Sequence, residues 1–83
     1  MIFGANIKLL RNRRGRTQEE VSIGMDISRS KLNGYENGHQ EPGLETLVLI
    51  SKYYKVSVDT LLKVDLTKLS ESQLGEIERG FDT

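Results

Sequence analysis

Two helix-start signals, eleven residues apart, most constrain what this chain can fold into. Thr17 is followed three residues later by Glu20, the pattern of a capping box in which each side chain bonds the other residue's backbone N–H. Ser28 is a second favourable N-cap. Between them stands Asp26, a residue type that tolerates the left-handed backbone conformation better than most. The segment therefore predicts two short helices joined by a tight turn.

Apolar and small residues mark the inward side of both predicted helices. Helices that cross steeply touch through few positions, and a small side chain is needed where the backbones come closest. The inward positions are Val21, Ser22, Met25, Ile27, Leu32 and Tyr35. Asn37 and Gly38 end the second helix, because glycine readily adopts the left-handed conformation after a helix. The outward side of that helix then carries Arg29, Ser30, Lys31 and Asn33.

The rest of the chain also has helical rather than strand-like periodicity. Phe3, Ile7 and Leu10 form the apolar stripe of a first helix that Gly15 ends. A fourth helix is predicted over about 44–54, and Ser57 caps a fifth. No stretch alternates clearly enough to indicate a strand. The predicted fold class is therefore all-α, with a five-helix domain over residues 1–63 and the helix pair at about 17–36.

Residues 64–83 form an extension of different character. Ser70 and Gln73 make a second capping box, and Leu74, Ile77 and Phe81 form a narrow apolar stripe. This pattern predicts a sixth helix. Because an isolated helix of this length is marginally stable, it needs a partner surface. Docking onto the domain, dimerisation through the stripe and disorder remain open alternatives.

The distribution of charge favours an anionic partner although the net charge is zero. Residues 1–31 hold seven basic and three acidic residues, a net charge of +4, and the remainder carries −4. A basic half beside an acidic half can offer one cationic face to nucleic acid. The competing interpretation is that Arg13, Arg14 and Arg16 are ordinary surface charges at a helix end.

Several function classes have no support in the composition. With no cysteine and one histidine, the chain offers no disulfide, no thiolate metal site and no expected cofactor. No apolar run approaches the length of a membrane span, and no signal-peptide core is evident. No catalytic constellation or phosphate-binding glycine loop is recognisable, so we expect no enzyme. We expect a cytoplasmic protein without membrane contact.

The chain resembles the XRE family, the Cro/C1-type helix-turn-helix of phage repressors and bacterial regulators. The matching segments are Thr17-Gln-Glu-Glu-Val-Ser, Ile27-Ser-Arg-Ser, Tyr35-Glu-Asn-Gly, Pro42 and Leu44-Glu-Thr-Leu. The resemblance covers about residues 7–62, and it is the joint spacing of these segments that makes it specific. It implies a lambda-repressor-like domain in which the helix over 28–36 enters the DNA major groove.

The resemblance also implies roles for individual residues. It places Arg29, Ser30, Lys31 and Asn33 at base edges, where arginine and lysine donate to guanine O6 and N7. It assigns contacts with the DNA backbone to Thr17, Gln18, Ser28, Asn37, His39 and Gln40. A free helix N-terminus independently favours a phosphate beside Gln18. Finally, it implies a structural ion pair between Arg11 and Glu36, which removes Arg11 from the DNA contacts.

The sequence departs from the family pattern at three positions. Asp26 stands where the turn usually has glycine, and Gly24 lies inside the first helix of the pair. Gly34 lies inside the second, at a family position that often carries a contacting side chain. We expect this loss to narrow the base footprint or to increase the share of phosphate contacts and shape readout.

The leading expectation is a sequence-specific regulator of transcription, acting as a repressor, that binds double-stranded DNA as a homodimer on two half-sites. It would work in the bacterial cytoplasm, at the nucleoid when bound. Two alternatives remain. The chain could be the antitoxin of a toxin–antitoxin pair, with residues 64–83 binding the toxin or another protein partner. It could also be a protein-interaction module that has lost DNA binding.

Overall fold

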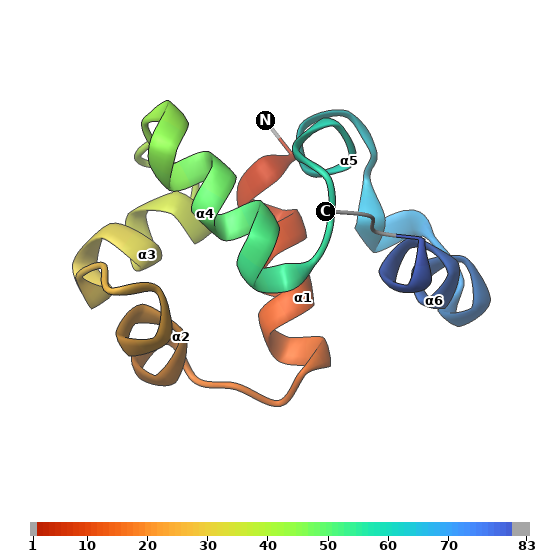
Figure 1. Ribbon diagram of the computed structural model, residues 1–83, viewed down its shortest axis with the longest axis horizontal. Helices are drawn as coiled ribbons and strands as arrows, with labels where there is room; N and C mark the ends of the chain where they lie inside the picture. The colour runs from red at the N-terminus through yellow and green to blue at the C-terminus, as the bar shows by residue number, and fades with distance from the viewer. Residues whose placement is uncertain (1, 81–83) are drawn as a thin grey trace.

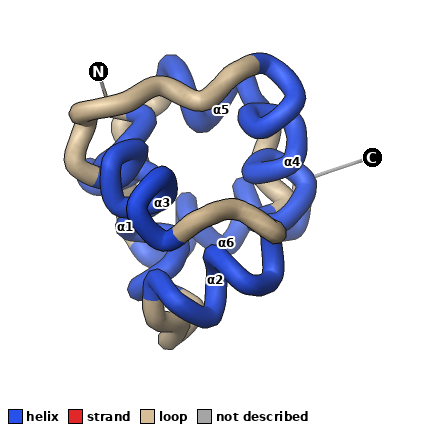
Figure 2. The backbone as a smooth tube through the Cα atoms, turned by 90° about the vertical axis from the view of Figure 1, so that its left-hand side faces the viewer, coloured by secondary structure: helices blue, strands red, loops and turns tan. Residues whose placement is uncertain are grey.

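The computed structural model describes residues 2–80, and all regular structure within them is helical (Figures 1 and 2). The elements are α1 (Phe3–Arg13), α2 (Gln18–Met25), α3 (Arg29–Glu36), α4 (Leu44–Tyr54), α5 (Val58–Lys63), the single 3-10 turn η1 (Leu66–Lys68) and α6 (Glu71–Arg79). The predicted all-α class with five helices and a sixth in the extension is confirmed. Phe81, expected on the stripe of the last helix, lies outside the described residues.

The local signals between α2 and α3 operate as the sequence indicates. Glu20 N donates to Thr17 Oγ1 at 3.1 Å, and Thr17 N donates to a carboxylate oxygen of Glu20 at 2.9 Å, so the capping box is complete. Ser28 Oγ accepts from Lys31 N at 3.1 Å. Asp26 takes the left-handed conformation, with φ 54° and ψ 46°. Aspartate therefore makes the turn that glycine usually makes in such pairs.

One apolar cluster holds the helices together. Its most deeply buried members come from every part of the domain: Ile7, Val21, Leu32, Ile50, Val56, Leu61 and Leu66. In Figure 1, α1 and α4 occupy the middle of the molecule, α2 and α3 lie at one end, and α6 lies at the other. This arrangement leaves the outer side of α3 uncovered. Among the described helices, none is long and apolar enough to cross a membrane.

A buried amide ties the first helix to the segment after α5. Asn6 has no exposed surface, and its Nδ2 donates to the carbonyl oxygens of Leu61 at 2.9 Å and Val64 at 2.7 Å. Its Oδ1 accepts from Leu66 N at 2.9 Å. Asn6 thus satisfies three backbone groups that would otherwise be buried without partners.

Helix α6 lies against α1 through apolar contacts and ion pairs. Leu74 is buried in the shared core, with Ile77 packed beside it. Glu78 accepts from Arg13 at 2.9 Å and from Arg14 at 3.1 Å, and Arg13 also pairs with Glu71. The hydrogen bond from Arg13 and the nearby Arg14 keep the pKa of the Glu78 carboxyl below its usual range. Arg13 and Arg14 are therefore engaged within the molecule instead of being free surface cations.

Candidate nucleic-acid interface

The outer surface of α3 presents a row of polar side chains. Arg29, Ser30, Lys31 and Asn33 are all exposed, as the sequence predicts for an outward face. At about 100° of rotation per residue, Asn33 lies between Arg29 and Ser30 around the helix. Lys31 lies on the opposite flank of the exposed surface. The three residues Arg29, Ser30 and Asn33 therefore form the more compact group, and Lys31 extends from its edge.

The N-termini of α2 and α3 add groups that suit an anion. The hydroxyl oxygens of Thr17 and Ser28 accept backbone hydrogen bonds as N-caps, which leaves each hydroxyl hydrogen able to donate. The first N–H groups of a helix have no acceptor within that helix. The N–H groups of Gln18 and Glu19 open α2 in this way, and a phosphate oxygen is a suitable acceptor for them.

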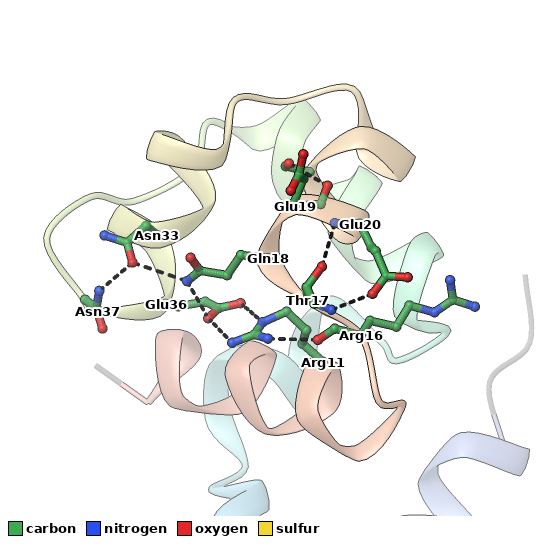
Figure 3. A network of polar contacts seen from close by, with 10 residues as sticks. Arg11, Arg16, Thr17, Gln18, Glu19, Glu20, Asn33, Glu36 and Asn37 are labelled. Carbon is green, nitrogen blue, oxygen red and sulfur yellow. Dashed lines mark hydrogen bonds and ion pairs between the residues drawn. The ribbon is translucent and has the colours of Figure 1, made fainter.

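A hydrogen-bond network centred on Glu36 lies directly behind this surface (Figure 3). The Glu36 carboxylate is 1% exposed and accepts from Arg11 Nε at 2.8 Å and from Arg11 Nη2 at 3.1 Å. Gln18 Nε2 donates to Glu36 Oε1 at 3.1 Å and to Asn33 Oδ1 at 3.2 Å. Asn37 Nδ2 donates to the same Asn33 oxygen at 3.0 Å. The network joins α1, α2 and α3.

The direction of these bonds follows from the chemistry of Glu36. A carboxylate only accepts, so Gln18 must turn its NH₂ group toward it. The second hydrogen of that NH₂ group is then donated to Asn33, which must accept it with its side-chain oxygen. With that oxygen accepting two bonds, Asn33 has only N–H groups to present outward. The free end of Gln18 is its amide oxygen, so the N–H donors near it come from the α2 backbone.

Arg11 braces the network from α1. Arg11 makes two bonds to Glu36, and its Nη1 also donates to the carbonyl oxygen of Arg16 at 2.8 Å. This bond fixes the connecting segment that leads into α2. The hydrogen bond to Glu36 raises the pKa of Arg11, an effect that its partial burial opposes. Arg11 and Glu36 thus lie where the resemblance implies, and the guanidinium faces the protein interior.

The loop after α3 folds back onto the outer surface of that helix. Gly38 has φ 76°, and the backbone N–H groups of His39 and Gln40 both donate to the carbonyl oxygen of Gly34, at 2.9 and 3.2 Å. The Gln40 side chain covers Gly34 so closely that a Cβ atom added there would lie 3.0 Å from Gln40 Cδ. The sequence pattern identified Gly34 as a missing side chain, but it did not show that another residue covers the position.

Comparison with known proteins decides which family has this arrangement. The helix-turn-helix family profile matches residues 7–61, which is most of the chain and contains α2, its turn and α3. The chain belongs to the Cro/C1-type helix-turn-helix family. The resemblance drawn from the sequence is therefore confirmed, and the domain is of the DNA-binding type found in transcription regulators.

Three curated relatives of this Cro/C1-type chain are named as transcription regulators. It is 35% identical over 75 residues to the HTH-type transcriptional regulator ImmR of Bacillus subtilis (strain 168), covering 89% of the chain and 59% of ImmR. It is 33% identical to the cryptic phage CTXphi transcriptional repressor RstR of Vibrio cholerae, covering 92% of the chain and 68% of RstR. It is 32% identical to the transcriptional activator BcrR of Enterococcus faecalis, covering 88% of the chain and 36% of BcrR.

No solved structure matches the chain significantly. Within residues 2–80, no group of three or more His, Cys, Asp or Glu side chains is placed to hold a metal ion. The site consists of the exposed polar side chains of α3, the N-termini of α2 and α3 and the network centred on Glu36.

Proposed function

We propose that this chain binds double-stranded DNA in a sequence-specific manner and regulates transcription. The observation that carries the proposal is the exposed polar face of α3, held in a fixed orientation by the network centred on Glu36 within a Cro/C1-type helix-turn-helix. An α-helix fits the major groove of B-form DNA, where each base pair presents a distinct pattern of donors and acceptors. The uncovered side of α3 has room for this docking.

The proposed base contacts come from the exposed face of α3. Arg29 and Lys31 donate to guanine O6 and N7, and Ser30 bonds a base edge or a phosphate. Asn33 contributes only N–H donors, because Gln18 and Asn37 already occupy its oxygen. Its partner on DNA is therefore an acceptor, such as guanine O6 or N7 or thymine O4.

The proposed backbone contacts lie around this face: Thr17, Gln18, Ser28, Asn37, His39 and Gln40. Contacts of this kind set the register of a protein on the duplex without reading its sequence. For Gln18, the supporting observation is the position of its backbone N–H at the start of α2, since its side-chain NH₂ group already donates to Glu36 and Asn33.

The names of the relatives support regulation of transcription over the antitoxin alternative. Among them, RstR is the one whose length the chain covers most fully, and it is named a repressor. We therefore propose repression, exerted at the nucleoid in the cytoplasm of a bacterium. ImmR and BcrR are longer than the matched region, so their full activities are not transferred to this chain.

Replacing Arg29 tests the base-reading role. We expect Arg29→Ala to weaken binding to the selected site by about 1–3 kcal/mol, roughly 5- to 150-fold, and to relax the preference at one base pair. DNA selected from a random pool by the unmodified protein and by the variant gives both results. Arg79→Ala, which removes an exposed arginine from α6, is the matched control and should keep site preference. An unchanged base preference in Arg29→Ala would show that Arg29 does not read a base.

A salt series on the unmodified protein tests DNA binding itself. A protein that neutralises phosphates releases counterions, so binding should weaken steeply as salt rises. Gel retardation of genomic fragments at several salt concentrations measures this. If no fragment is retarded even at low salt, the protein is the interaction module that has lost DNA binding.

We also propose that the chain acts as a homodimer on a two-fold symmetric site, with half-sites about one helical turn apart. Truncation after Leu69 tests whether α6 forms the dimer contact while leaving the buried Leu66 in place. If α6 mediates dimerisation, light scattering should show a dimer before truncation and a monomer after it. An unchanged assembly state would mean that α6 only packs against α1 within one chain. Residues 64–83 would then take no part in self-association.

A further inference from the structure

Gly34 leaves an empty position on the outward part of α3. It follows Ser30 by four residues, so it lies one turn further along the same side of the helix. A side chain at this position would start out toward the groove that α3 is proposed to enter. Glycine supplies no side chain there, and the exposed polar row of α3 is interrupted.

The side chain of Gln40 fills this position from the loop. A Cβ atom added to Gly34 would lie 3.0 Å from Gln40 Cδ, 3.1 Å from Cγ and 3.3 Å from Oε1. The amide of Gln40 therefore occupies the space in which a side chain of residue 34 would begin. Gly34 lies on the outer side of the helix and is nevertheless buried, because the Gln40 side chain covers it.

The loop backbone is fixed to the residue that the side chain covers. Gln40 N donates to Gly34 O at 3.2 Å, and His39 N donates to the same oxygen at 2.9 Å. The left-handed Gly38 allows the chain to turn back after α3. The backbone of Gln40 is thus held against α3, and its side chain lies over Gly34.

The side-chain amide of Gln40 is also free to act as donor and acceptor at once toward a base edge. Gln18 has both side-chain hydrogens directed to other residues, and Asn33 has its oxygen occupied twice. Within residues 2–80, no hydrogen bond engages the side-chain amide of Gln40, which is exposed. Simultaneous donation and acceptance by one amide is the pattern that reads adenine, through N7 and the N6 amino group.

We infer that Gln40 reads a base, with adenine as its partner, in place of the side chain that α3 lacks at Gly34. This inference rests on the proposed DNA-binding function and changes the role of Gln40 within it, from a contact with the DNA backbone to a determinant of specificity. Base reading by α3 is then extended by a loop residue that packs on its glycine.

Selection of bound DNA from a random pool, followed by affinity measurements on single-base variants of the selected site, tests this role. The unmodified protein should show one adenine preference that Gln40→Ala removes, with discrimination at that base pair falling roughly 5- to 150-fold. Gln40→Glu should move the preference toward cytosine, whose N4 amino group a carboxylate accepts from. Preferences at the other base pairs should remain.

His39→Ala is the matched control in the same loop, and it should weaken all sites alike if His39 contacts only the backbone. If Gln40→Ala also weakens all sites alike, with the adenine preference intact, Gln40 is a backbone contact and the inference is wrong. If the unmodified protein selects no site at all, the proposed function fails instead. The two failures are therefore distinguishable.

Discussion

Arg11→Ala is expected to lower the free energy of unfolding by about 3–5 kcal/mol. The substitution removes the guanidinium that donates two hydrogen bonds to Glu36, whose side chain is 1% exposed. Among residues 2–80, a carboxylate left in that position keeps only the Gln18 amide as a hydrogen-bond partner. Urea denaturation followed by circular dichroism measures the change, and a loss below about 1 kcal/mol would show that the pair adds little.

Two further variants separate the buried charge from general loss of packing. Arg79→Ala removes an exposed arginine from α6 and should change stability by less than about 0.5 kcal/mol. A double variant, Arg11→Met with Glu36→Met, removes both charges together and should recover much of the lost stability, because no unpaired charge then remains buried. If the double variant is less stable than Arg11→Ala, unpaired charge is not the cause.

The same substitution should also disturb DNA binding. Glu36 anchors Gln18, and Gln18 in turn holds the oxygen of Asn33. Without Arg11 the carboxylate loses two of its three hydrogen bonds and is no longer held in one position, which loosens both amides. We therefore expect Arg11→Ala to weaken DNA binding even below its unfolding temperature, although Arg11 itself does not face the groove.

Gly4→Ala is expected to destabilise the protein by about 3 kcal/mol, at the upper end of the range for overpacking. A Cβ atom at Gly4 would lie 2.4 Å from the carbonyl oxygen of Tyr35 and 2.8 Å from that of Glu36. Both neighbours are backbone atoms at the end of α3, so no side chain can rotate away. Helices α1 and α3 would have to separate, which would also displace the exposed face of α3.

Gly75→Ala is the matched control, since it places the same methyl group inside another helix. The atom it would approach most closely is Nη1 of Arg79, at 3.1 Å, and this flexible side-chain end can shift. Alanine favours a helix interior over glycine by up to about 1 kcal/mol, so Gly75→Ala should be neutral or stabilising. Thermal melts of both variants decide the comparison. Equal effects would rule out close approach as the reason for glycine at position 4.

Signals within a few residues of one another predicted much of the structure correctly. The capping box of Thr17 and Glu20, the N-cap Ser28 and the left-handed Asp26 are all confirmed. These features depend on bonds between near neighbours in the chain, so they are readable from a short stretch of sequence. The spacing of such segments was also sufficient to indicate the helix-turn-helix family.

Other features required knowledge of which distant residues meet. Nothing around Asn6 in the sequence indicates that its amide would bond the backbone near Leu61 and Leu66, more than fifty residues away. From the sequence, Arg13 and Arg14 could be interpreted either as cations that attract DNA or as ordinary surface charges. Their pairing with Glu78 depends on where α6 docks, which the apolar stripe alone left open.

The helix-turn-helix itself was therefore determined by the sequence, because caps, turn residues and apolar spacing act locally. The surface that it presents was decided by the tertiary structure. Glu36 fixes which way the amides of Gln18 and Asn33 point, and a loop residue, Gln40, covers Gly34 of α3. Hydrogen-bond direction and side-chain cover both depend on atoms that lie close only after the helices have packed.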